Sequence, residues 1–400
     1  MVDIAERICN PPSRQELERR WALVREVLRE HRCEALIIQA ANNVNGTGGH
    51  FRWLTGVPVP SSYPQTVIFP ADGLATVVMH GGFGERAQLD DRDVSAPGVG
   101  LRLFAPSFPG VDYCGPLDAQ LVLSELRKAG YRRVGIVAAH NWYASMATGL
   151  FGAADAPEFV DLTPPIDVLK AWKSPEEIGF LRQTAAMQDA ILAGVAERIK
   201  PGVKEFEVMA YAQYLGQTMG SEGGYFLGSS APPGEPMSFR RRGEQGRELR
   251  EGDVFYVQCE NSGPGGLFTH VGRYFVLGKA PQLLQDMFGL ALEAQDFTMT
   301  LLEPGRACAG IFDEYNAWME SRGQQPERRV HCHGQGYDVV EAPLIRQDET
   351  MVLGANTNIG FHPAITSGKQ LFTCCDNIFV GEGGAIERLH KTPRAIVELN

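Results

Sequence analysis

The sequence predicts an α/β protein built from two domains. Helical and strand patterns alternate through the first 160 residues, which is typical of an α/β domain. This alternation stops at residues 161–165, and a strongly capped helix follows, so we expect one domain over 1–163 and a second over 170–400. A chain of 400 residues is long enough to give each domain its own hydrophobic core.

The elements of the first half follow from hydrophobic spacing. Leu17, Trp21, Val24 and Leu28 recur at helical intervals and predict an amphipathic helix over 14–32. Short apolar runs predict buried strands, two of which flank a Pro-Ala-Asp-Gly turn. The strands are expected at 35–38, 66–69, 75–79 and 134–137, and a second helix is expected at 117–128.

The second half opens with a recognisable helix start. Ser174 can cap the first free N–H groups, Pro175 stands where no donor is needed, and Glu177 can bond back to the cap. This pattern predicts a helix from about 175 to 200. Pro-Gly pairs at 201–202 and 304–305 are each followed by a new helical pattern, which favours a duplicated unit of two helices plus strands.

Charge and composition restrict the partners. The chain has 37 basic and 48 acidic residues and a net charge of −11, a field that repels phosphate backbones and anionic lipid. The sequence has no apolar run long enough for a membrane span, no signal-peptide pattern at its start, and eight scattered cysteines without a CxxC pair. We therefore expect a cytoplasmic protein with a small-molecule substrate, and neither nucleic acid nor a membrane as partner.

A series of motifs in the second half resembles one enzyme family. The capped linker at 173–178, the strand pattern at 252–257, the His333–Gly336 turn, Glu341–Pro343 and the segment 375–380 occur in the order found in the creatinase / aminopeptidase P / prolidase group, family M24. The resemblance covers about residues 165–390. It implies an N-terminal creatinase-like α/β domain, a C-terminal pita-bread catalytic domain and a homodimer.

The resemblance also implies a metal site, and here the sequence departs from the pattern. Peptidases of this group hold two divalent ions with Asp, Asp, His, Glu and Glu. The corresponding positions in this chain are Gln258, His270, His333, His362 and Cys375. Four of the five differ, and neither an imidazole nor a neutral amide can replace a carboxylate that bridges two cations. We therefore expect no dinuclear peptidase site.

The altered pocket indicates acid/base chemistry without a metal cofactor. Imidazole both takes and gives a proton near neutral pH, so we expect His333 to be the acid/base, with His270 and His362 orienting the substrate. The remaining pocket residues predicted to contact the substrate are Gln258, Glu260 and Cys375. The function expected is that of a non-peptidase hydrolase or lyase acting on a small polar molecule that bears a carboxylate or an amide.

Two alternatives stay open. His270, His333, His362 and Cys375 offer nitrogen and sulfur donors that suit one divalent transition-metal ion, which would make the protein a mononuclear metal enzyme. The domain could also be a binding protein without catalysis, although that would favour large apolar side chains in the cavity over the polar ones present.

Two further segments are candidates for substrate contact. The turn-rich stretch 42–53 lies where the resemblance implies a loop that reaches the active site of a partner subunit, so His50 and Arg52 are expected to complete a neighbouring pocket. The run Arg240–Arg242 could hold a substrate carboxylate, because guanidinium matches a carboxylate bidentately. The substrate itself and the bond that is cleaved are not readable from the sequence.

Overall fold

The computed structural model describes residues 4–40, 49–58, 63–91, 93–237 and 239–399. The chain divides into two compact units, 1–170 and 171–400. The segment that interrupts the sequence pattern at 161–165 is the start of helix α5 (Thr163–Ala171), because two prolines are tolerated in a first helical turn, where backbone donors have no partner. Among the described residues no helix is both long and apolar enough to cross a membrane.

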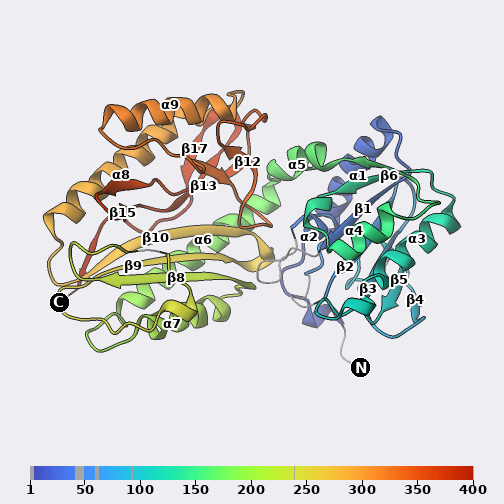
Figure 1. The fold of residues 1–400 in the computed structure, drawn as a ribbon, viewed down its shortest axis with the longest axis horizontal. Helices are drawn as coiled ribbons and strands as arrows, with labels where there is room; N and C mark the ends of the chain where they lie inside the picture. Colours follow the sequence, from blue (N-terminus) through green and yellow to red (C-terminus); the bar gives the residue numbers. More distant parts are fainter. Residues whose placement is uncertain (1–3, 41–48, 59–62, 92, 238, 400) are drawn as a thin grey trace. The chain divides into compact units, whose positions relative to one another are not determined.

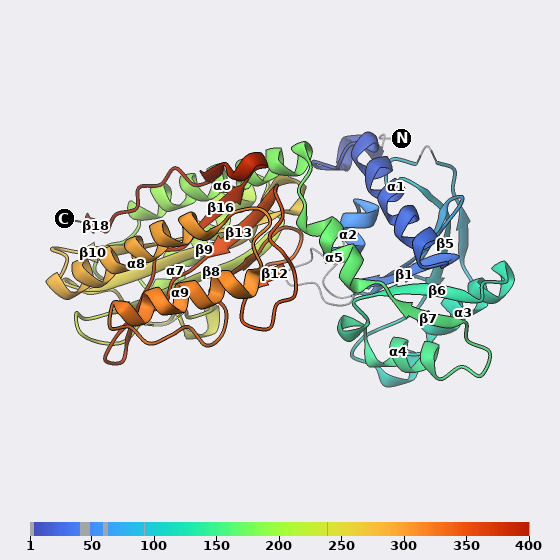
Figure 2. The same ribbon diagram turned by 90° about the horizontal axis from the view of Figure 1, so that it is seen from above.

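One mixed sheet forms the centre of the N-terminal unit. Within the described residues it has seven strands in the order β4-β5-β3-β2-β1-β6-β7. Strand β1 pairs in parallel with β6 and antiparallel with β2. Helices α3 and α4 pack on one face through a core that includes Val122, Leu126 and Met146, and α1 lies on the other side (Figure 2). The elements are α1 (Arg14–Glu30), β1 (Ala35–Ala40), α2 (Gly49–Thr55), β2 (Gln65–Pro70), β3 (Ala75–His80), β4 (Arg86–Gln88), β5 (Val99–Ala105), α3 (Leu117–Ala129), β6 (Arg133–Val137), α4 (Ala144–Phe151) and β7 (Glu158–Asp161).

The C-terminal unit contains two main sheets. Four of the described strands form the sheet β18-β10-β9-β8, and five form the sheet β12-β11-β13-β16-β17. Figure 1 shows α8 and α9 on the side of the second sheet and α7 on the side of the first. The helices are α6 (Pro175–Ala196), α7 (Glu205–Thr218), α8 (Gln282–Leu301) and α9 (Cys308–Ser321). The strands are β8 (Gly223–Ala231), β9 (Val254–Ser262), β10 (Phe268–Leu277), β11 (Cys332–Gly334), β12 (Glu341–Ile345), β13 (Thr357–Phe361), β14 (Ile365–Ser367), β15 (Gln370–Phe372), β16 (Asp376–Val380), β17 (Ile386–Arg388) and β18 (Val397–Leu399).

The start of α6 follows the predicted capping pattern. Ser174 Oγ accepts from Glu177 N at 3.2 Å, and Ser174 N donates to Glu177 Oε2 at 2.9 Å. The helix ends at Ala196, four residues before the Lys200 limit expected from the sequence. Each Pro-Gly pair leads into a helix, α7 or α9, so the unit contains two helix pairs, each packed on its own sheet.

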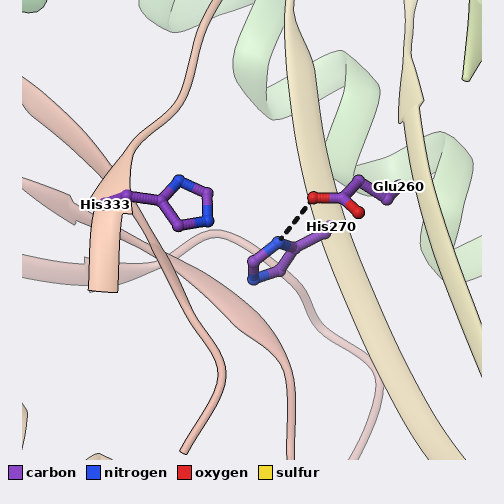
Figure 3. A group of neighbouring side chains, drawn as sticks. All are labelled: Glu260, His270 and His333. Atoms are coloured by element: carbon purple, nitrogen blue, oxygen red, sulfur yellow. Dashed lines mark hydrogen bonds and ion pairs between the residues drawn. The ribbon is translucent and has the colours of Figure 1, made fainter. Parts of the chain in front are cut away.

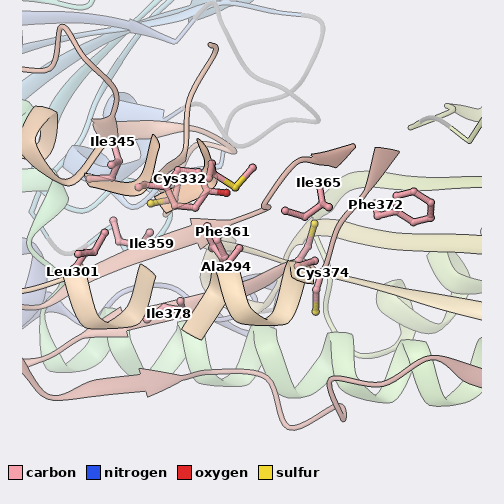
Figure 4. Packing of buried hydrophobic residues seen from close by; sticks show 14 of the residues in the cluster. Ala294, Leu301, Cys332, Ile345, Ile359, Phe361, Ile365, Phe372, Cys374 and Ile378 are labelled. Atoms are coloured by element: carbon pink, nitrogen blue, oxygen red, sulfur yellow. The ribbon is translucent and has the colours of Figure 1, made fainter. Parts of the chain in front are cut away.

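Strand alternation divides the unit into layers. Odd-numbered residues of β9 and β10, such as Phe255 and Val271, join the core under α6 and α7. A second core packs α8 and α9 against β11, β13 and β16, with Cys332, Ile359 and Phe361 among its members (Figure 4). The even-numbered residues of β9 and β10 therefore face the interior between the sheets, which is where the polar candidates of the sequence lie.

Candidate functional site

The first sheet contributes Glu260 and His270. The two residues lie directly opposite each other, on β9 and β10, so their side chains emerge on the same face of the sheet. The Nδ1 atom of His270 is 3.4 Å from Glu260 Oε1 (Figure 3). His270 is fully buried, whereas the side chain of Glu260 keeps 13% of its exposure. The carboxylate therefore marks the side from which a ligand can approach.

The second sheet contributes His333, from β11, and His362, which directly follows β13. The ring centroid of His333 is 5.9 Å from that of His270 and 5.2 Å from that of His362, and the His270–His362 distance is 5.8 Å. Gly360 makes this approach possible, since a Cβ there would lie 2.9 Å from His270 Cε1 and 3.2 Å from His333 Cε1. The structure thus brings together the three histidines predicted from the sequence.

His270 is held by its backbone and by both ring nitrogens. Its backbone N donates to Asn377 Oδ1 at 2.7 Å, which fixes the strand position. Its two ring nitrogens both face acceptors, because Nδ1 contacts Glu260 and Nε2 is 3.3 Å from the carbonyl oxygen of Phe361. A neutral imidazole has a single N–H, so in that form only one of these two contacts is a hydrogen bond that the ring donates.

His333 is held as a neutral base. Its Nδ1 lies 2.9 Å from the carbonyl oxygen of Gly334, so Nδ1 carries the proton and Nε2 keeps a lone pair. Burial, together with the positive charge of His270, lowers the pKa of His333 to about 4. In Figure 3 the far ring nitrogen points toward His270 and Glu260.

Glu260 and His362 differ in charge at neutral pH, and both are partly exposed. Burial alone raises the pKa of Glu260, but the hydrogen bond from His270 and the charges of His270, His333 and Arg329 hold it below its ordinary value, so the carboxylate is ionised. Burial and the charges of His333 and His270 lower the pKa of His362 well below its ordinary value. The imidazole of His362 is therefore neutral at pH 7, and its ring lies 5.2 Å from that of His333.

One group of possible metal ligands is present within the described residues. A carboxylate oxygen of Glu260 and one ring nitrogen each of His270 and His333 lie within 4.8 Å of one another. The sequence-based alternative had His270 and His333 in a metal set with His362 and Cys375, and had Glu260 as a substrate contact. The register of β9 and β10 explains the difference, because Glu260, two residues after Gln258, is the residue opposite His270.

Gln258 and Cys375 lie one step further along the same sheet face. Gln258 is opposite Gly272, and Cys375 pairs with Gly272 through an isolated bridge. The Cys375 Sγ atom is 3.5 Å from Gln258 Oε1 and 3.1 Å from the hydroxyl of Tyr256. These two predicted residues therefore contact each other, in a separate cluster with Tyr256.

In the N-terminal unit, His50 has a local partner and Arg52 is buried. His50 Nε2 is 2.7 Å from Asp167 Oδ1, and Arg52 is 1% exposed on α2. Residues 41–48 of the turn-rich stretch lie outside the described residues. The role of His50 and Arg52 in a partner subunit stays a prediction.

Arginine placement differs from the sequence-based expectation. The members of the 240–242 run are exposed, and Arg241 and Arg242 stack over Tyr225 and Phe206 at 4.8 and 4.2 Å. Arg329 instead acts electrostatically on Glu260, His333 and His362. It is exposed, and no ion-pair partner of its guanidinium occurs among the described residues. In the sequence, the only indication that Arg329 belongs near the site is its position four residues before His333.

Comparison with known proteins identifies the relatives of this chain. The Xaa-Pro dipeptidase of Pyrococcus furiosus is 24% identical over 263 residues, covering 63% of this chain and 72% of that protein. The Xaa-Pro aminopeptidase of Escherichia coli is 22% identical over 227 residues, covering 52% and 51%.

Solved structures show the same fold over nearly the whole length. The X-Pro aminopeptidase of Thermotoga maritima has a TM-score of 0.74 at 15% identity and covers 95% of this chain and 99% of its own. The prolidase of Pyrococcus horikoshii has a TM-score of 0.74 at 18% identity, with 95% and 100% covered. The predicted pita-bread architecture is confirmed. The model of metallopeptidase family M24 matches residues 179–387, more than half of the chain, and this protein therefore belongs to that family of hydrolases.

Proposed function

We propose that this protein hydrolyses an amide bond of a small polar molecule at the cluster of Glu260, His270 and His333. Membership in family M24 supports hydrolysis. The observation that carries the assignment to these residues is the bond between His333 Nδ1 and Gly334, which leaves Nε2 as a lone pair beside an ionised carboxylate. A base and a carboxylate in one place are what the attack of water on an amide carbon requires.

His333 acts as the base in this proposal. Its lowered pKa keeps the ring neutral at pH 7, so Nε2 can accept a proton from the attacking water. The Gly334 carbonyl holds the ring orientation while the proton is transferred, because it stays bonded to Nδ1–H.

Glu260 and His270 lie next to this base. Glu260 supplies a negative charge, and a ring N–H of His270 can donate to a substrate carbonyl oxygen as negative charge develops there. His362 completes the arrangement as a neutral imidazole that orients the substrate.

A single divalent ion also fits the donor set. One carboxylate and two imidazoles form a common three-residue ligand set for a catalytic ion such as Zn²⁺. Such an ion, when bound, supplies Lewis-acid polarisation of a carbonyl oxygen. The donor set does not fit two ions, because Gln258 and Cys375 replace charged oxygen ligands.

The activities in the names of the relatives indicate which substrates to test first. Because they include Xaa-Pro dipeptidases, Xaa-Pro dipeptides belong in the assay beside N-acyl amino acids and small cyclic amides. The non-peptidase specificity expected from the sequence predicts cleavage of the latter two classes and not of dipeptides.

The test is product formation from this panel by the purified protein, with a chelator and with added Zn²⁺, Mn²⁺ or Co²⁺. We expect the wild type to release an amine from at least one class, and a folded His333→Gln variant to release none above background. The control is His140→Gln, which changes an exposed histidine of the N-terminal unit. Equal rates for the wild type and His333→Gln would overturn the proposal, and full activity in chelator would exclude the metal form.

A further inference from the structure

Three residues next to the proposed site form a closed cluster of their own. Tyr256 and Gln258 lie on the same face of β9 as Glu260, since residues two apart in a strand share a face. Cys375 is brought to them by its bridge to Gly272 on β10. From the resemblance, Gln258 and Cys375 are predicted to stand at two of the five positions at which the peptidases of this group hold their ions.

The polar atoms of this cluster contact one another. The hydroxyl of Tyr256 donates to Gln258 Oε1 at 3.0 Å, and the thiol of Cys375 contacts the same oxygen at 3.5 Å. The hydroxyl and the sulfur are 3.1 Å apart, and Thr373 Oγ1 lies 3.7 Å from the sulfur. Both lone pairs of the amide oxygen are therefore directed at donors within the cluster.

The space around these atoms is also filled. Tyr256, Gln258 and Cys375 are 4%, 5% and 0% exposed. The tyrosine hydroxyl occupies the volume over Gly272, where a Cβ would lie only 2.0 Å from it. A cation entering here would have to displace the hydroxyl and break its hydrogen bonds.

We propose that Tyr256, Gln258 and Cys375 replace the second cation subsite with a neutral hydrogen-bonded cluster, so that this chain binds at most one divalent cation. The inference deepens the proposed function, on which its assignment of the remaining cation to Glu260, His270 and His333 rests.

The experiment counts bound cations. Wild-type protein and the variant Tyr256→Phe/Gln258→Glu/Cys375→Asp are titrated with Mn²⁺ and with Co²⁺ by calorimetry, and the ions retained after gel filtration are measured. We expect at most one ion per wild-type chain and one more in the variant, whose two new carboxylates are not blocked by a hydroxyl. The thermal midpoint of the variant should rise with added cation by several degrees more than that of the wild type.

The outcomes separate this inference from the proposed function. Two ions per wild-type chain, or a folded variant that binds no more than the wild type, would overturn the cluster assignment. No ion in the wild type and one in the variant would support it while excluding the metal form of the proposed function. Amide hydrolysis and its loss in His333→Gln test the proposed function independently of any ion count.

A single substitution covers the case in which the triple variant does not fold. Cys375→Ser keeps a neutral donor, so the Co²⁺ affinity should stay within about twofold of wild type and the absorption spectrum should not change. Loss of a thiolate-to-cobalt band, or a loss of affinity of tenfold or more, would show that Cys375 is a ligand and would overturn the proposal.

Discussion

Two clusters lie side by side on one face of the β9–β10 ladder, and they differ in charge and in access. Glu260 is ionised and partly exposed, and it faces His333, which keeps a free lone pair. Gln258 and Cys375 are buried, and their polar atoms bond to each other and to Tyr256. The cluster of Glu260, His270 and His333 can therefore bind a ligand, whereas the cluster of Tyr256, Gln258 and Cys375 cannot.

The comparison shows what makes a set of polar residues a site. Both clusters contain residues that the sequence resemblance predicts at metal-binding positions. The difference is that every strong acceptor of the second cluster already has a donor, whereas the first has an anion, a lone pair and a histidine placed between two acceptors. The two clusters therefore differ less in residue type than in whether their polar groups, near the surface, still lack a hydrogen-bond partner.

The largest effect is expected when the base of the first cluster is removed. His333→Gln should lower kcat/KM by about 10²–10⁴-fold, the usual contribution of general acid–base catalysis. Because neutral His333 is the active form and its pKa is about 4, the acid limb of the wild-type pH profile should lie near 4 and not near 6.5. Initial rates between pH 4 and 8 check both points, and an acid limb at 6.5 would point to another base.

The thiol of the second cluster, Cys375, should be unreactive toward alkylating reagents over a wide pH range. Since the pKa of Cys375 is raised to about 12, alkylation of this thiol at pH 9 should be more than about 100-fold slower than that of exposed Cys9. The measurement is the rate of iodoacetamide labelling of each peptide by mass spectrometry on folded protein. Comparable rates at the two cysteines would show that the cluster opens to solvent.

A methyl group added at Gly272 should destabilise the cluster of Tyr256, Gln258 and Cys375. Gly272→Ala places a methyl group against the Tyr256 hydroxyl, so we expect a loss of about 1–3 kcal/mol in the free energy of unfolding. The control is Gly179→Ala on α6, where a Cβ meets no atom within 4 Å and the helix should gain stability. Urea unfolding measures both, and a smaller cost of Gly272→Ala in a Tyr256→Phe background would identify the hydroxyl as the obstacle.

The smallest effect is expected at the edge of the first cluster. If the substrate bears a carboxylate, Arg329→Gln should raise KM about three- to tenfold and leave kcat within about twofold, because an exposed cation contributes modest binding energy. Arg328→Gln is the matched control, since Arg328 is also exposed and is not among the main charges that shift the pKa values of Glu260 and His333. Equal KM values for the two variants would remove Arg329 from substrate recognition.

Local sequence patterns were sufficient to predict several helices and strands of the fold. The helix at 117–128 and the strands at 35–38 and 134–137 are confirmed as α3, β1 and β6, with ends that differ by at most two residues. The Ser174 capping box is confirmed atom by atom. These features depend on neighbours in the sequence, so a single chain reveals them. The segment 161–165, which interrupts the sequence pattern, includes the start of α5, because prolines fit both a linker and a first helical turn.

The sequence by itself determined the family and the layered fold, because ordered motifs and hydrophobic periods are local properties. The meeting of His270, His333 and His362 was expected only through the resemblance to that family, and the structure brings the three rings together. Only the tertiary structure decided which residue stands across from His270 and which polar groups are already bonded. Those outcomes depend on strand register and on contacts between residues more than 100 positions apart, such as Tyr256 with Cys375. A one-residue change of register would exchange the residues on the two faces of a strand, and no local pattern in this sequence fixes it.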